Sequence, residues 1–62
     1  MIVANDGVTI TQMGNCITCS NGEHYTLVGM VLTGPNGFRS MNVNSISEAI
    51  GIVVGRHGGK RF

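Results

Sequence analysis

The side chains that could carry nucleophilic, acid–base or metal chemistry are few in this sequence. It has two cysteines, two histidines and three carboxylates among 62 residues. Cys16 and Cys19 enclose two residues, and His24 follows after four more. This spacing resembles the start of a zinc site, because thiolates and imidazoles are ligands that zinc prefers.

A structural zinc site needs four ligands, and His57 could complete a set of Cys16, Cys19, His24 and His57. In a regular strand, however, Cys16 and Cys19 would point to opposite faces, so chelation would require a turn at 17–18. We therefore expect no metal and no cofactor, and interpret the cysteines as small, half-buried side chains of a reduced protein. The zinc set is the alternative.

Few side chains of the sequence could act in catalysis. Glu48 is expected to cap a helix, and Glu23 and His24, as neighbours in a strand, would diverge to opposite faces. A pairing of either cysteine with His57 is the remaining nucleophilic arrangement, and no oxyanion device accompanies it in the sequence. We expect no catalytic residues and a non-enzymatic protein.

A second group of candidates lies in the glycine-rich basic C-terminal segment 55–62. Glycine-rich backbone can direct its N–H groups at an anion, and arginine can bind phosphate through two hydrogen bonds. The one cation outside this segment could extend the same surface. The predicted phosphate-binding residues are Arg56, His57, Gly58, Gly59, Lys60, Arg61 and Arg39. The alternative is a solvated basic terminus that binds nothing.

The elements that must position these residues are short. Turn-forming Asn, Asp and Gly cluster at 5–7, 14–15, 21–22 and 34–37. Between the clusters lie runs rich in Val, Ile, Thr and Tyr, at 2–4, 8–13, 16–20, 24–33 and 38–43. This pattern predicts a mostly β protein, a small antiparallel meander or partial barrel of about five short strands. The longest run, 24–33, is expected to bend or bulge at Gly29.

The pattern changes after residue 43. Ser45 and Glu48 form a capping box, which predicts a helix start. Because Gly51 and Gly55 disfavour a helix and 52–54 is β-branched throughout, we predict one short helix near 46–50 and then a strand at 52–54. A single helix reaching Gly55 is the alternative.

The composition limits the classes of protein to which this sequence could belong. The chain is 42% hydrophobic and 11% charged with a net charge of +1, which favours one small folded domain over 1–62. A chain of this size buries only about 60% of its unfolded surface, so we expect self-association to add to its core. Neither a membrane-spanning stretch nor a secretory leader is evident, so we expect a cytoplasmic protein without a membrane partner.

Together these features predict a small binding module that self-associates and binds a phosphate-bearing ligand, nucleic acid or nucleotide, through segment 55–62. The alternative is a protein–protein interaction module or small inhibitor, of the kind that viruses and mobile elements encode. That module would contact another protein through the apolar strand faces of 24–33 and 38–43.

Overall fold

The computed structural model describes residues 2–59, which form one antiparallel sheet and one α-helix. Six strands follow one another across the sheet in chain order, so each strand pairs with its neighbour in the sequence. They are β1 (Ile2–Val3), β2 (Thr9–Met13), β3 (Cys16–Cys19), β4 (His24–Val28), β5 (Val31–Thr33) and β6 (Arg39–Ser40). The predicted mostly β antiparallel meander is confirmed, with six strands in place of about five.

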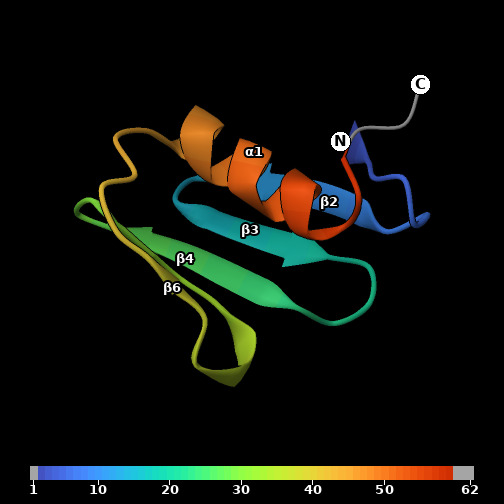
Figure 1. Cartoon of the computed structure of the whole chain (residues 1–62), viewed down its shortest axis with the longest axis horizontal. Coiled ribbons are helices and arrows are strands. Elements are labelled where there is room, and N and C mark those ends of the chain that lie inside the picture. Colours follow the sequence, from blue (N-terminus) through green and yellow to red (C-terminus); the bar gives the residue numbers. More distant parts are fainter. Residues whose placement is uncertain (1, 60–62) are drawn as a thin grey trace.

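The core lies between the sheet and the helix α1 (Ile46–Arg56), which runs across one face of the sheet (Figure 1). Paired residues on neighbouring strands point to the same side, so the register fixes which side chains meet the helix. Ile17 pairs with Tyr25, and Leu27 pairs with Leu32. The buried hydrophobic residues are Ala4, Ile10, Ile17, Cys19, Tyr25, Leu27, Leu32, Val43, Ala49, Val53 and Val54.

The opposite side of the sheet, which we call the outer face, carries the alternate residues of each strand. The register places Thr11 beside Thr18 and Thr33 beside Arg39 on this face. Its members are Val3, Thr9, Thr11, Met13, Cys16, Thr18, His24, Thr26, Val28, Val31, Thr33 and Arg39. Every threonine of the sequence belongs to this set, and none of the carboxylates does.

The run 24–33 is two strands and not one. Val28 pairs with Val31, so the chain reverses through a two-residue turn at Gly29 and Met30. Gly29 has a φ of 61°, which a residue without a side chain adopts at little cost. The predicted irregularity at Gly29 is therefore a complete hairpin turn, and this accounts for the additional strand.

The predicted strand at 52–54 is wrong, because α1 continues without a break to Arg56. Ser45 caps the helix start by accepting a hydrogen bond from the Glu48 amide at 3.3 Å. The Glu48 carboxylate accepts one from the Asn44 amide at 2.7 Å. Val53 and Val54 are buried against the sheet, and burial of such residues outweighs their weak intrinsic preference against a helix.

Two glycines give opposite expectations for stability. Gly51 lies on the exposed side of α1 with no atom near the position of an added Cβ. Gly51→Ala should therefore raise the free energy of unfolding by about 0.5–1 kcal/mol, since alanine has less backbone entropy to lose.

A Cβ on Gly34 would come within 2.5 Å of the Tyr25 ring. Gly34→Ala should accordingly destabilise the protein by about 1–3 kcal/mol, the range for overpacking a core. Urea unfolding of the two variants beside the wild-type protein measures both effects. A Gly51→Ala protein less stable than the wild type would contradict the helix assignment at this position.

Candidate functional site

The most connected polar group of the protein centres on His57, which immediately follows α1. Its Nδ1 lies 2.6 Å from Oδ2 of Asp6, and its Nε2 lies 2.8 Å from Oε1 of Glu23. The His57 side chain is only 9% exposed. One imidazole thus joins three distant segments: the turn after β1, the β3–β4 turn and the end of the helix.

Backbone hydrogen bonds place His57 at this junction. The amide of Asn5 donates to the carbonyl of Gly59 at 2.8 Å, and the amide of Asp6 donates to the carbonyl of His57 at 3.3 Å. The Asn5 side chain donates to the carbonyl of Gly58 at 2.5 Å. The chain leaving α1 is therefore joined to residues 5 and 6 along its length, so Asp6 faces the imidazole.

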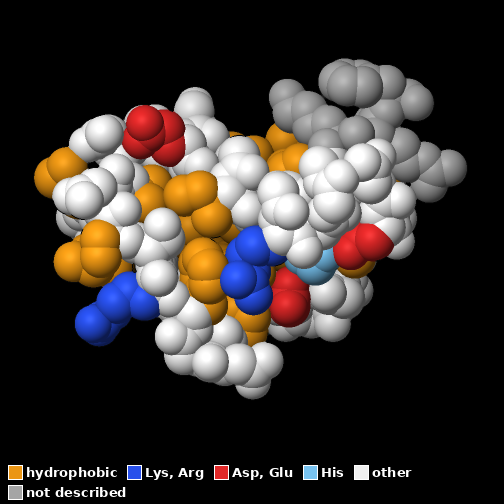
Figure 2. Space-filling model, viewed as in Figure 1, with side chains coloured by type: hydrophobic (Ala, Val, Ile, Leu, Met, Phe, Trp, Pro, Cys, Tyr) orange, Lys and Arg blue, Asp and Glu red, His pale blue; other side chains and the backbone are white. Residues whose placement is uncertain are grey.

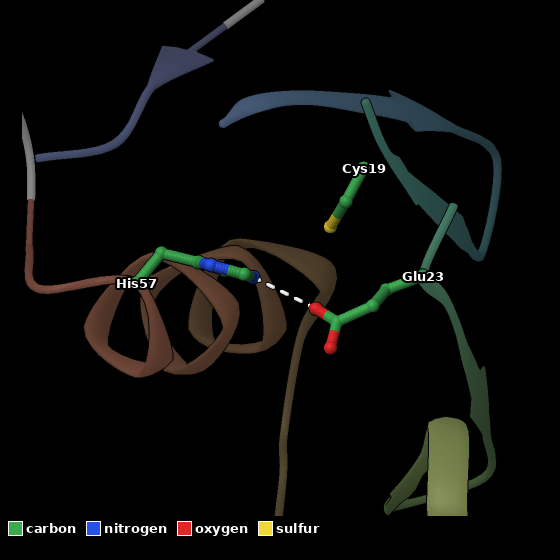
Figure 3. Close-up of side chains that lie close together, drawn as sticks. All are labelled: Cys19, Glu23 and His57. Carbon is green, nitrogen blue, oxygen red and sulfur yellow. Dashed lines mark hydrogen bonds and ion pairs between the residues drawn. The ribbon is translucent and has the colours of Figure 1, made fainter. Parts of the chain in front are cut away.

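Glu23 reaches His57 from the β3–β4 turn. The Glu23 amide donates to the Asn21 side chain at 3.0 Å, and the Cys19 amide donates to the Glu23 carbonyl at 2.9 Å. These two bonds close a tight loop that places the Glu23 carboxylate beside Cys19 and opposite His57 (Figure 3). His24 is the next residue, and it lies on the outer face, as the strand alternation predicted.

The electrostatics of the three ion-paired groups support one another. The hydrogen bond to Asp6 and the Glu23 carboxylate raise the pKa of His57 above its ordinary value of 6.5, despite its burial. The Val8 amide and then His57 lower the pKa of Asp6 below 3.8. Desolvation alone would raise the pKa of Glu23, but hydrogen bonds from His57, Asn21 and Tyr25 outweigh it and lower the pKa below 4.5.

An aromatic group extends the network toward β6. The Tyr25 hydroxyl lies 3.3 Å from Oε1 of Glu23 and accepts a hydrogen bond from Nε of Arg56 at 3.0 Å. The Arg56 guanidinium lies 4.2 Å from the centre of the Phe38 ring, and Phe38 meets Tyr25 edge to face at 5.5 Å. Arg56 is therefore held over the face of an aromatic ring, an arrangement that favours a cation.

The residues predicted to bind phosphate that lie within 2–59 are divided between the two sides of the sheet. Arg56 lies beside the His57 network, whereas Arg39 is on the outer face, the other side of the sheet. The amides of Gly58 and Gly59 donate to carbonyls of α1, at 3.3 and 2.9 Å, and so do not face an anion. Both nitrogens of His57 are engaged by carboxylates. Lys60 and Arg61 lie outside the described residues.

The predicted zinc set is divided between the two faces of the sheet. Cys16 and His24 are exposed on the outer face, whereas Cys19 and His57 lie on the helix side. On that side, the Sγ of Cys19, a Glu23 oxygen and a His57 nitrogen all lie within 4.8 Å of one another (Figure 3). These three atoms are of the types that hold a borderline divalent metal ion.

Sequence reasoning missed Asp6 and Glu23. Asp6 lies in the turn cluster at 5–7, and Glu23 directly follows the turn cluster at 21–22. The sign that could have found them is a carboxylate in each of two turns, together with a histidine in a segment where every other side chain is basic, aromatic or glycine. Asp6 and Glu23 both contact His57 only because α1 crosses the sheet and ends beside them. A strand at 52–54, as predicted, would not place His57 there.

The environment of Cys19 does not suit a nucleophile. Burial, with the nearby charges of Glu23 and Asp6, raises the pKa of the Cys19 thiol above 9.0. Reactive cysteines have the opposite shift, because the thiolate is the nucleophile. The Nε2 of His57, which would have to take the thiol proton, is engaged by Glu23.

The fold and site define a six-stranded antiparallel meander with a helix on one face and a histidine-centred ionic network at the helix end. Comparison with models of known protein families, with curated proteins and with solved structures gives no match. Among residues 2–59, no helix has the length and apolar character needed to cross a membrane.

The His57 network predicts how the stability of the metal-free protein depends on pH. A chelator in the buffer keeps the protein metal-free during the measurement. Because the pKa of His57 is raised on folding, its contribution is complete below pH 6.5 and is lost as pH rises through the folded value. The contributions of Asp6 and Glu23, whose pKa values are lowered, are complete above pH 4.5 and are lost on acidification. The network should therefore stabilise the protein most between these limits.

His57→Gln should cost about 1–3 kcal/mol within that window, the range for charged hydrogen bonds, and less above it. Urea unfolding across the pH range measures the difference from the wild type. His24→Gln is the matched control, because His24 is exposed on the outer face and should leave the profile unchanged. An equal loss at every pH would show that the charge of His57 does not contribute.

Proposed function

We propose that this protein is a non-enzymatic binding module that associates with a second copy of itself through an apolar end. The observation that supports this is the clustering of its exposed large hydrophobic side chains. Among the described residues these are Met13, Val28, Met30 and Met41, which are 73%, 65%, 53% and 62% exposed. We call these four residues the apolar end.

Backbone contacts bring the four residues together. Met13 ends β2, and Val28 ends β4 with Met30 in the turn that follows. The β2–β3 turn adjoins β4, because the Leu27 amide donates to the Asn15 carbonyl at 2.8 Å. The segment after β6 adjoins the β4–β5 turn, because the Val43 amide donates to the Met30 carbonyl at 2.8 Å. The turns at one end of the sheet therefore expose one apolar patch.

The apolar surface is distinct from the His57 network. Figure 2 shows hydrophobic side chains exposed at the left end of the molecule with an acidic and a basic group beside them, and basic, acidic and histidine side chains side by side farther to the right. Exposed apolar patches on small proteins mark interaction sites, and methionine adapts its shape readily to a partner. The remaining neighbours of the apolar end on the outer face are mostly threonine and valine.

A second copy fits this surface because the outer face is almost uncharged. Asp6 and Glu23 pair with His57 on the helix side of the sheet, so neither carboxylate lies on the outer face. Arg39 and His24 are the ionisable side chains of the outer face other than Cys16. A chain this small also gains a larger core by pairing, since alone it buries a limited share of its surface.

Lysine substitutions at the apolar end should break the assembly. We expect the wild-type protein to run as a dimer or larger species in light scattering coupled to size exclusion, with Val28→Lys/Met30→Lys at least tenfold weaker in association. Thr18→Lys is the control, because it places a lysine on the outer face, away from the apolar end. Both variants should retain the circular dichroism of the folded protein.

A monomeric wild-type protein at high concentration would overturn self-association. If that monomer instead captured a different protein, and Val28→Lys/Met30→Lys lost the capture, the same surface would serve a heterologous partner. Equal weakening by Thr18→Lys would place the contact away from the apolar end.

Arg56 favours a second candidate function, the recognition of a phosphate-bearing ligand. Among the described residues no carboxylate lies within ion-pair distance of it, and its guanidinium is held against Phe38 with Nε on Tyr25. Its remaining N–H groups are therefore positioned on a rigid support, and arginine binds phosphate through two such groups. Lys60 and Arg61 follow it closely in the sequence.

Binding of a fluorescent single-stranded oligonucleotide tests this candidate. Affinity should fall steeply as salt increases, because cations that meet phosphates release counterions. Arg56→Gln should weaken binding several-fold, whereas Arg39→Gln, on the other face of the sheet, should not. Equal effects of the two substitutions, or salt-independent binding, would exclude a site at the end of α1.

A further inference from the structure

We propose that Cys19, Glu23 and His57 form a binding site for a zinc-class divalent ion, with Asp6 as the residue that orients His57. This inference is independent of self-association and of the phosphate ligand. It rests on three donor atoms of different chemistry, Sγ, carboxylate O and imidazole N, that lie within 4.8 Å of one another. They come from the end of β3, the β3–β4 turn and the residue after α1.

An ion would draw the three donor atoms, which now lie within 4.8 Å of one another, to a common spacing. Tetrahedral zinc with bonds of about 2.0–2.3 Å places its ligand atoms about 3.3–3.6 Å apart. The His57 and Glu23 atoms are now 2.8 Å apart and share a proton, so they would separate by roughly half an ångström as the ion replaced that proton. Three protein ligands leave a fourth position for water, which the 27% exposure of the Glu23 side chain allows.

All three ligands are already held by hydrogen bonds. Cys19 and Glu23 are closed into one loop by the bond from the Cys19 amide to the Glu23 carbonyl and by that from the Gly22 amide to the Cys19 carbonyl, at 2.9 and 3.0 Å. His57 is held from behind by Asp6, at 2.6 Å from Nδ1. A carboxylate on the far nitrogen of a ligating histidine is the usual outer support of a zinc site.

The charges also balance. A carboxylate lies against each ring nitrogen of His57, so in the metal-free cluster a protonated imidazole would satisfy both hydrogen bonds while Cys19 carries its thiol proton. A divalent ion would displace one proton from His57 and one from Cys19, so two positive charges replace two. The net charge of the cluster does not change. This matters because Cys19 and His57 are only 2% and 9% exposed, and an uncompensated charge on a buried group would be costly.

The donor set selects the type of ion. A thiolate and an imidazole suit zinc and cobalt(II), whereas magnesium and calcium take oxygen ligands. Bound in this way, the ion would cross-link the hairpin between β3 and β4 to the end of α1. That cross-link would replace the hydrogen bond between His57 and Glu23, so the folded structure would be retained.

Titration of the chelator-treated full chain tests the site, with zinc competing against a chromophoric chelator and with cobalt(II) followed by absorption. We expect one ion per chain, a thiolate-to-cobalt charge-transfer band and a rise in melting temperature with zinc. Cys19→Ser should lose the band and bind zinc at least about 100-fold more weakly. Asp6→Asn should weaken binding about 10–100-fold, as for outer-sphere carboxylates.

Cys16→Ser is the matched control, because Cys16 belongs to the same cysteine pair but lies exposed on the outer face. It should retain the band, the stoichiometry and the rise in melting temperature. Circular dichroism in chelator confirms that each variant is folded before titration, and Glu23→Gln gives a second test if Cys19→Ser does not fold.

Absence of stoichiometric zinc binding by the wild-type protein at micromolar zinc would overturn the proposal. So would loss of the cobalt band in Cys16→Ser with its retention in Cys19→Ser, since this would place the ion on the outer face. Binding that is equal in the wild-type, Cys19→Ser and Glu23→Gln proteins would also overturn it.

Discussion

The double attachment of His57 is the interaction on which the arrangement of the whole chain depends. One imidazole, held by Asp6 at 2.6 Å and by Glu23 at 2.8 Å, joins the beginning of the chain, its middle and the end of its helix. A meander pairs each strand only with its neighbour, so the sheet alone would leave the helix free to take several positions. Hydrophobic contacts pack the helix onto the sheet. The directional hydrogen bonds of His57 then fix the position of the end of the helix on the sheet.

This arrangement separates the molecule into two chemically different parts. At one end, the carboxylates of Asp6 and Glu23 and the cations His57 and Arg56 are occupied with one another or with aromatic partners. At the other end, the turns expose methionine and valine to solvent. Pairing charge with charge inside the molecule leaves the outer face nearly neutral.

The sequence was informative where local chemistry decides the structure. Turn residues at 5–7, 14–15 and 21–22 predicted the strand boundaries, and Ser45 with Glu48 predicted the helix start. It was misleading where tertiary packing outweighs local preference, as at the buried Val53 and Val54 of α1. The candidate site could not be predicted, because Asp6 and His57 are 51 positions apart and meet only once the helix is complete.

The same long-range contact has a kinetic meaning. Every strand pair of the sheet joins sequence neighbours, so the strands can associate hairpin by hairpin without closing a large loop. The bonds between residues 5–6 and 57–59 instead close a loop that spans almost the entire chain, with the largest entropy cost to form early. A junction that forms late governs the rate of unfolding more than the rate of folding. Loss of the His57 contacts is therefore expected to speed unfolding more than it slows folding.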